Sequence, residues 1–363
     1  MSTHTAIAAV AKGQFDAIQV EMEKPGAGQV RVKVAYASLA AFDTYIADVG
    51  FGVAKLYPVG LGLNAAATVV EVGEGVTALA VGDRIMAFSV YEFGRGTGGL
   101  SGTIQELLVL RDFLCAKVPD KLALEAAATI PDNFVSAFYA LFDQLALPVP
   151  AAFPASTPPP DHALPILIYG AGSTSGQYAI QLLHAAGYTN IVATASPKHH
   201  AFLRGLGATR VVDYASPTLA ADITTGGEQM ALALDTISAE GTLAKIAQVL
   251  KPQGAVALLL PIKDGDTVAV GEAAMHMAVP EGRNPFTPET KIVYVRAFTY
   301  YQNEYLKDNL MSKILPQLLA AGIIQPNRVR LLEQGTFKER VAVGLDLLRN
   351  NRVSGEKVIV KVP

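Results

Sequence analysis

The sequence is short of cysteine, of long hydrophobic runs and of excess charge. Cys115 is the one cysteine among 363 residues, so no internal disulfide and no thiolate zinc cluster can form, and a reducing, cytoplasmic setting fits. No apolar run reaches the roughly 18 residues of a membrane helix. Residues 1–10 lack the cationic start and apolar core of a secretory signal. A net charge of −3 without a large basic patch does not indicate nucleic-acid binding.

The length and composition predict two domains with sizeable cores. The chain is 51% hydrophobic and 17% charged, and domains usually hold roughly 100–200 residues. Residues 5–117 show the pattern of many short strands, as in the period-two alternation of residues 30–36. Further along, strands alternate with helical patterns. The sequence therefore predicts an all-β part followed by an α/β part.

The chain is organised around residues 164–214. An apolar strand at 165–169 leads into Gly170-Ala171-Gly172-Ser173-Thr174-Ser175-Gly176, here called the glycine turn, then a helix and a second strand at 190–195. This order predicts a dinucleotide-binding unit, although the glycine spacing is one residue longer than the standard pattern. Gly170 is expected to allow a sharp exit from the strand. Gly172 would let a pyrophosphate approach the backbone, and Gly176 would let the helix pack closely.

The serines and threonine of the glycine turn favour an anion. Ser173, Thr174 and Ser175 bring hydroxyl and N–H groups to a helix N-terminus, where the helix dipole attracts negative charge. A glycine loop that binds nothing, or that binds another nucleotide, is the open alternative.

The end of the second strand points to the cofactor. An NAD site would carry Asp or Glu about 20 residues after the turn, to bind the ribose 2′-hydroxyl. This chain has Ser196-Pro197-Lys198 instead, and a hydroxyl with a cation suits a 2′-phosphate. Tyr214, after a third strand at 210–213, is also within expected reach of that phosphate. The sequence therefore predicts NADPH.

More strands and helices follow the glycine turn. Strands are expected at residues 230–235, 254–260 and 292–298, and helices at 242–250, 306–321 and 337–350. A helical pattern at 123–145 should split at Pro131, and residues 147–165 form a proline-rich loop. A closing strand at 357–361 would return to the first domain.

Several segments carry a resemblance to a known family. They are Val81-Gly82-Asp83-Arg84, Ala126-Ala127-Ala128-Thr129-Ile130-Pro131, the glycine turn, Leu206-Gly207-Ala208 before Val212-Asp213-Tyr214, and Val353-Ser354-Gly355-Glu356-Lys357. Their order resembles the medium-chain dehydrogenase/reductase superfamily, within its zinc-free quinone-reductase and enoyl-reductase branch. Fungal trans-acting enoyl reductases of polyketide pathways look most similar.

The resemblance implies an α/β fold with two domains. A GroES-like antiparallel β catalytic domain would comprise residues 1–125, with 300–363 returning to it. A doubly wound parallel Rossmann sheet would occupy residues 126–299, with the active site in the cleft between the two.

The resemblance also implies that no zinc is bound. Zinc alcohol dehydrogenases of this superfamily carry a Cys and a Gly-His-Glu where this chain has residues 38–43 and 61–64, and neither stretch offers a thiolate or an imidazole. His199 and His200 are adjacent, so they point apart on a helix or strand, and metal binding there, or at His276, is not expected.

The chemistry implied by the resemblance is hydride transfer from NADPH to the β-carbon of an α,β-unsaturated carbonyl. Tyr45 is the candidate hydrogen-bond donor to the enolate oxygen; the fungal relatives often have a Lys at this place, and a tyrosine simply packed in the cleft is equally open. Ser136 stands where relatives contact the nicotinamide, or else it is a helix-packing hydroxyl. Asp43 is expected to bind loop backbone.

Two other functions stay open. One is an NADPH-dependent quinone reductase of the same fold, and the other is a catalytically silent partner protein. The expected ligand is a small molecule or a carrier-bound acyl chain, and the chain would act as a monomer or a homodimer.

Overall fold

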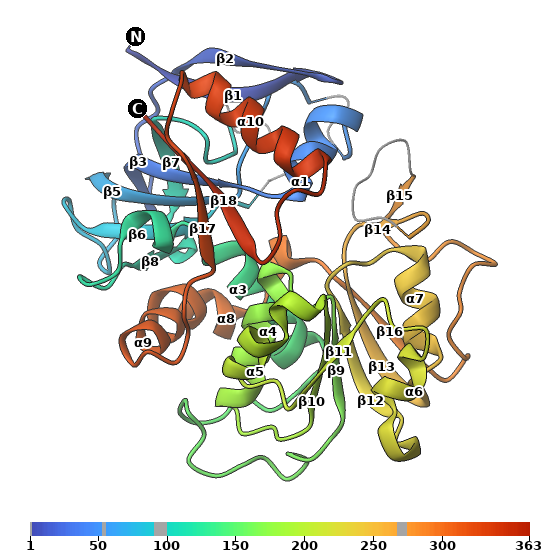
Figure 1. The fold of residues 1–363 in the computed structure, drawn as a ribbon. Coiled ribbons are helices and arrows are strands. Elements are labelled where there is room, and N and C mark those ends of the chain that lie inside the picture. The colour runs from blue at the N-terminus through green and yellow to red at the C-terminus, as the bar shows by residue number, and fades with distance from the viewer. Residues whose placement is uncertain (1, 53–55, 91–99, 267–273) are drawn as a thin grey trace. The chain divides into compact units, whose positions relative to one another are not determined.

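The computed structural model describes residues 2–52, 56–90, 100–266 and 274–363 (Figure 1). The chain divides into two compact units. The first comprises Met1–Asp132, Phe298–Ala321 and Gln325–Pro363. The second comprises Asn133–Ala297 and Gly322–Ile324.

The second unit is built on a six-stranded parallel sheet. In spatial order its strands are β11 (Arg210–Asp213), β10 (Ile191–Ala195), β9 (Ile166–Tyr169), β12 (Met230–Asp235), β13 (Leu250–Leu259) and β16 (Lys291–Val295). By position in the chain this is the order 3-2-1-4-5-6 of a doubly wound dinucleotide-binding sheet. The predicted Rossmann fold is confirmed.

Helices cover both faces of this sheet. Figure 1 shows α4 (Thr174–Ala185) and α5 (His200–Gly205) on one side, and α6 (Leu219–Ile223) and α7 (Glu240–Ala247) on the other. Right-handed crossovers require this arrangement, because the chain reverses its direction across the sheet after β11. Every residue of β9 and β10 is buried, as expected of strands covered on both faces.

The first unit holds two sheets. In the larger, β17 (Arg328–Leu332), β18 (Glu356–Lys361), β3 (Gln29–Leu39), β5 (Asn64–Val72), β6 (Arg84–Phe88) and β8 (Cys115–Lys117) pair in that order, and β7 (Leu107–Arg111) also pairs with β3. The smaller sheet consists of β2 (Gln14–Glu21), β1 (Thr3–Ala11) and β4 (Val59–Gly60). Apart from the parallel β17–β18 pair, the strands of both sheets pair in antiparallel fashion.

The C-terminal strand pairs with the N-terminal part of the chain, as predicted. β18 lies antiparallel to β3, with Val358 opposite Leu39. Its other neighbour, β17, was not predicted. Two of its five residues are arginines and none of the five is buried, so the strand lacks the apolar alternation by which strands were predicted.

The remaining elements are short, except for α10 (Phe337–Arg349). Pro131 begins α3 (Pro131–Phe138) and separates it from α2 (Leu124–Ala127), so the predicted split is confirmed. The others are α1 (Ala41–Thr44), η1 (Tyr45–Val49), η2 (Asp112–Leu114), η3 (Tyr139–Gln144), η4 (Pro197–His199), η5 (Thr225–Gly227), β14 (Ile262–Lys263), β15 (Met275–His276), η6 (Ala297–Gln302), α8 (Glu304–Asn309), η7 (Leu310–Ile314) and α9 (Leu315–Ala320).

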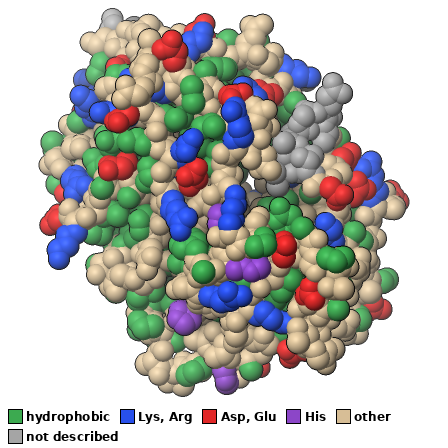
Figure 2. All heavy atoms as spheres, viewed as in Figure 1, with side chains coloured by type: hydrophobic (Ala, Val, Ile, Leu, Met, Phe, Trp, Pro, Cys, Tyr) green, Lys and Arg blue, Asp and Glu red, His purple; other side chains and the backbone are tan. Residues whose placement is uncertain are grey.

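Surface charge is mixed. Figure 2 shows Lys and Arg side chains singly or in small groups among acidic, polar and hydrophobic ones. In the part of the chain that the structure describes, no helix is both long enough and apolar enough to cross a bilayer.

Candidate functional site

The glycine turn begins with a residue that has to be glycine. Gly170 has a φ of 75°, in the left-handed region that side chains disfavour. A Cβ placed on it would lie 2.4 Å from Cγ1 of Ile237. Its backbone N–H donates to the hydroxyl of Thr194 at 3.0 Å. The predicted sharp exit from β9 is confirmed.

The start of α4 is closely packed and capped. A Cβ on Gly176 would lie 2.7 Å from Cα of Ala171, so glycine lets the helix contact the backbone of the turn itself. The hydroxyl of Ser173 accepts from the N–H of Gly176 at 3.0 Å and donates to Oγ1 of Thr236 at 2.9 Å. Ser173 is therefore an N-cap whose hydroxyl is engaged within the protein.

Gly172 differs from the other two glycines. A Cβ there would lie 3.4 Å from Cδ2 of His199 and 3.8 Å from Cβ of Ala195, which are ordinary contacts. The packing of the protein alone therefore does not demand glycine at this position. Close approach of a pyrophosphate remains the predicted reason for it.

The start of α4 contacts a residue of α3, which precedes the parallel sheet in the chain. Asn133 Nδ2 donates to the hydroxyl of Ser175 at 3.0 Å. Gln177, which the sequence argument missed, donates its side-chain amide to the carbonyl of Gly172 at 3.1 Å. Ser175 is buried and Thr174 is half-buried. Two side chains that flank the turn thus help to shape it.

The residues predicted to bind the 2′-phosphate lie at one edge of the sheet. Parallel pairing of β10 and β11 runs to Ala195 opposite Asp213, so Ser196 and Tyr214 leave the sheet at the same level. Ser196 is half-buried, Lys198 is exposed in η4, and Tyr214 is 48% exposed. A hydroxyl, an ammonium and a phenol are available at the strand ends where the adenosine ribose of such folds is expected.

The two predicted catalytic residues belong to different units. Tyr45 begins η1 in the first unit, is 6% exposed, and lies edge-on to Phe42 with ring centroids 6.2 Å apart. Burial raises its pKa well above the usual range of a phenol. Ser136 lies in α3 of the second unit and is half-buried. Their roles stay predictions.

Residues 38–43 and 61–64, which offer neither a thiolate nor an imidazole, are joined by one carboxylate. Asp43 accepts hydrogen bonds from the backbone N–H of Ala40 at 2.7 Å and of Gly62 at 2.6 Å. The prediction that Asp43 binds loop backbone is confirmed. Burial raises its pKa to about 6, although both hydrogen bonds and Lys357 oppose this shift.

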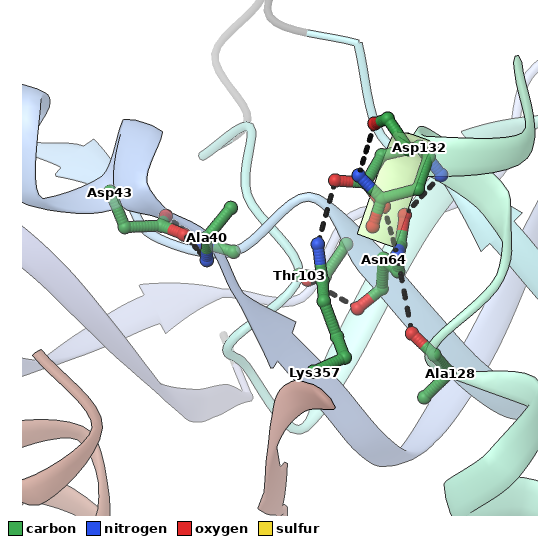
Figure 3. A network of polar contacts seen from close by, with 10 residues as sticks. Ala40, Asp43, Asn64, Thr103, Ala128, Asp132 and Lys357 are labelled. Carbon is green, nitrogen blue, oxygen red and sulfur yellow. Dashed lines mark hydrogen bonds and ion pairs between the residues drawn. The ribbon is translucent and has the colours of Figure 1, made fainter. Parts of the chain in front are cut away.

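A second buried network lies beside it (Figure 3). Lys357 Nζ forms an ion pair with Asp132 at 2.8 Å, with side chains 4% and 7% exposed. Asn64 donates to the other oxygen of Asp132 at 2.7 Å and to the carbonyl of Ala128 at 3.2 Å. The network joins β5, β18 and the start of α3, so it ties the C-terminal strand to the N-terminal part of the unit.

The histidines are used within the fold. The ring of His200 contacts the carbonyl of Ala195 at 3.0 Å, and His276 contacts Asp264 at 2.8 Å. His199 is 7% exposed beside Gly172. Among the described residues, no group of three or more His, Cys, Asp or Glu side chains could hold a metal ion.

The sequence analysis did not single out Asp235 and Lys263, two buried charged residues of the second unit. Asp235, at the end of β12, is fully buried and accepts from the hydroxyl of Thr242 at 2.5 Å. Lys263 is 5% exposed on β14. A charge at the end of an apolar run was the only sequence signal, and it does not separate these residues from surface ones.

A glycine turn at the head of a doubly wound sheet, joined in one chain to an antiparallel β unit, defines a nicotinamide-dinucleotide-binding oxidoreductase. Comparisons with known proteins agree. Residues 26–120 match the alcohol dehydrogenase GroES-like domain, and residues 176–281 match the zinc-binding dehydrogenase family.

Relatives support the same assignment over most of the chain. Trans-enoyl reductase himH of Aspergillus japonicus is 30% identical over 92% of this chain and 90% of its own length. The enoyl reductase component lovC of lovastatin nonaketide synthase, from Aspergillus terreus, is 30% identical over 83% and 81%. The crystal structure of CurK enoyl reductase has the same fold, with a TM-score of 0.76 and 20% identity over the full length of both chains.

The chain belongs to the medium-chain dehydrogenase/reductase superfamily, in the branch that includes the fungal trans-enoyl reductases.

Proposed function

We propose that this protein reduces an activated carbon–carbon double bond, in an enoyl or enone substrate, with hydride from NADPH and without zinc. The observation that carries the proposal is the relation to trans-enoyl reductase himH, at 30% identity over nine-tenths of both chains. The name of that relative describes it as a reductase of enoyl groups. Its transfer to this chain is our inference.

The residues of the glycine turn fit a dinucleotide. Gly170 and Gly176 shape the turn, and Gly172 leaves its backbone open where the packing of the protein does not need that space. α4 is a capped helix of 12 residues, and the dipole at its N-terminus favours a pyrophosphate. When bound, the cofactor supplies hydride, and the protein supplies binding and orientation.

The preference for NADPH rests on charge at the end of β10. Ser196 and Lys198 offer a hydroxyl and an ammonium there, and Tyr214 adds a phenol from the neighbouring strand end. A carboxylate at this place would repel a 2′-phosphate and favour the free hydroxyl of NADH. Asp213 ends the neighbouring strand β11, opposite Ala195. One oxygen of its carboxylate accepts a hydrogen bond from the backbone N–H of Ala215 at 3.0 Å.

The chemical role of the first unit is to stabilise the enolate. Addition of hydride to the β-carbon places negative charge on the carbonyl oxygen, and a donated hydrogen bond lowers the energy of that state. Tyr45 is the proposed donor. A phenol is protonated at neutral pH even at its ordinary pKa, and burial raises the pKa of Tyr45 further, so its hydroxyl has a proton to donate. Ser136 is proposed to contact the nicotinamide.

The setting is proposed on the same grounds. The substrate is a small molecule or an acyl chain on a carrier, in the cytoplasm, with neither nucleic acid nor membrane as a partner. Light scattering during size-exclusion chromatography would tell whether the protein is a monomer or a homodimer.

The test measures consumption of the reduced cofactor by the purified protein. NADPH and NADH are first titrated by fluorescence, and NADPH oxidation is then followed with an enone, an enoyl thioester and a quinone. We expect tighter binding of NADPH and turnover with the enone or thioester. Faster turnover with the quinone would support a quinone reductase. Binding without turnover of any acceptor would support the catalytically silent partner protein.

A further inference from the structure

The segment after β12 lies at the point where the strand order reverses. β12 pairs with β9, from which the glycine turn departs, and ligands of such sheets bind at the carboxyl ends of the strands at this reversal. Residues 236–239, here called the β12 turn, connect β12 to α7. Within it Ser238 has a φ of 52°, unusual for a residue other than glycine. Such a conformation persists only where the surroundings hold it.

Two buried charged side chains hold the β12 turn. The carboxylate of Asp235 accepts from the N–H groups of Ile237 at 2.9 Å and Ser238 at 3.0 Å. Lys263 Nζ donates to the carbonyl of Ile237 at 2.5 Å and to that of Pro261 at 3.3 Å. The backbone N–H of Lys263 donates to the carbonyl of Ser238 at 2.8 Å. The acidic residue thus binds the donors of the turn and the lysine binds its acceptors.

Lys263 is deeply placed for a cation. Lys263 is 5% exposed. Burial lowers the pKa of its ammonium group to about 8, and the negative charge of Asp235 opposes this shift. A buried lysine is costly unless its hydrogen bonds and a nearby charge compensate. Here the compensation is specific to the β12 turn and the segment before β14.

The β12 turn in turn contacts the glycine turn. The side chain of Ile237 lies against Gly170, where an added Cβ would come within 2.4 Å of it. Thr236 Oγ1 accepts from the hydroxyl of Ser173 at 2.9 Å and lies 2.9 Å from the carbonyl of Gly170. A shift of the β12 turn would therefore move the two residues that shape the proposed pyrophosphate site.

We infer that Lys263 is a positioning residue for the dinucleotide. By holding the carbonyl of Ile237, it keeps the β12 turn seated on the glycine turn, in the arrangement that receives the pyrophosphate and the nicotinamide half. Lys263 donates to backbone carbonyls and has no proposed contact with a reacting atom. The inference rests on dinucleotide binding by the family and does not depend on the preference for NADPH.

The test separates positioning from plain stabilisation with two ligands. Lys263→Met is compared with Lys245→Met, which changes an exposed lysine on α7. Dissociation constants are measured for NADPH and for adenosine 2′-monophosphate, which lacks both the pyrophosphate and the nicotinamide half. We expect Lys263→Met to weaken NADPH by about tenfold, the effect of one lost charged hydrogen bond. The fragment should change by less than about twofold, because it binds at distant strand ends.

Other outcomes decide against the inference. Unchanged NADPH binding by a folded Lys263→Met protein, or equal weakening of both ligands, would overturn it. Lys263→Arg keeps a cation and should recover part of the lost affinity. If wild-type protein prefers NADH, the same comparison uses NADH and adenosine, which lacks the pyrophosphate.

A second variant is measured if Lys263→Met does not fold. If Lys263→Met is unfolded by circular dichroism, Lys263→Gln, which keeps a donor, is measured with the same ligands and judged by the same criterion. If neither variant folds, Lys263 serves the fold itself and the positioning role is overturned.

Discussion

Asp43 and Gly62 are joined by a hydrogen bond of 2.6 Å, from the backbone N–H of Gly62 to the carboxylate of Asp43. The bond connects α1, which follows β3, with the stretch before β5. Neither stretch carries a thiolate or an imidazole. In this chain a carboxylate and backbone N–H groups hold them together.

The pH dependence of stability should report the burial of Asp43. Its pKa is raised from 3.8 to about 6, so the folded state binds the proton more tightly than the unfolded state. The stabilising effect of the proton is complete below about pH 4 and is lost as the pH rises through about 6, a change of about 3 kcal/mol. Relative to Asp43→Asn, which does not titrate, wild-type protein should lose stability over this interval. Unfolding by urea at pH 4.5 and pH 7 measures the difference, and a constant difference would contradict the shift.

Removal of Lys357 should leave a buried charge without its cation. We expect Lys357→Met to lower the free energy of unfolding by about 3–5 kcal/mol, because the buried carboxyl group of Asp132 loses the ammonium with which it is paired. The double variant with Asp132→Asn should lose less than the sum of the two single changes. A double-mutant cycle by urea unfolding measures the coupling, and strict additivity would argue against the ion pair.

Gly170 and Gly205 form a matched pair for alanine substitution. Gly170→Ala meets a left-handed φ and the side chain of Ile237, so we expect a loss of about 2 kcal/mol or more and weaker cofactor binding. Gly205 ends α5, and nothing lies within 4 Å of an added Cβ. Gly205→Ala should be neutral or slightly stabilising. Thermal unfolding and NADPH titration give both quantities, and equal effects would refute the steric argument.

Reversal of charge at Lys198 should reduce the preference for NADPH. Lys198→Glu places a carboxylate beside the proposed 2′-phosphate, so the dissociation constant for NADPH should rise by about tenfold or more, with NADH little affected. Lys245→Glu makes the same charge change on exposed α7 and is the control. Fluorescence titration with both cofactors measures the ratio. Equal weakening of NADPH by the control would show a general charge effect.

Loss of the Tyr45 hydroxyl should slow the chemical step. If Tyr45 donates to the enolate, Tyr45→Phe lowers kcat by about 10²–10⁴-fold and leaves NADPH binding unchanged. Tyr57→Phe is the control, because the Tyr57 hydroxyl lies 3.5 Å from a backbone carbonyl of the same unit. Steady-state kinetics with the best acceptor decides. Turnover equal to wild type would mean that Tyr45 only packs against Phe42.

Much of the second unit was predictable because its patterns are local. The apolar runs that became β9, β10 and β12, and the glycines between β9 and α4, are determined by neighbours in the chain. β17 was missed because its pattern is weak, and its position depends on pairing with β18. The role of Ser173 also needed the structure, since its partner Thr236 lies 63 residues away.

The sequence alone determined the succession of strands and helices, the glycines required for a tight turn, and the lack of thiolate and imidazole in two key stretches. These are local properties of composition and spacing. Only the tertiary structure showed that Asp43 reaches Gly62, that Lys357 pairs with Asp132, and that Lys263 holds the turn after β12. Each is a contact between residues distant in the chain, and a buried charge is recognisable only when the atoms that surround it are known.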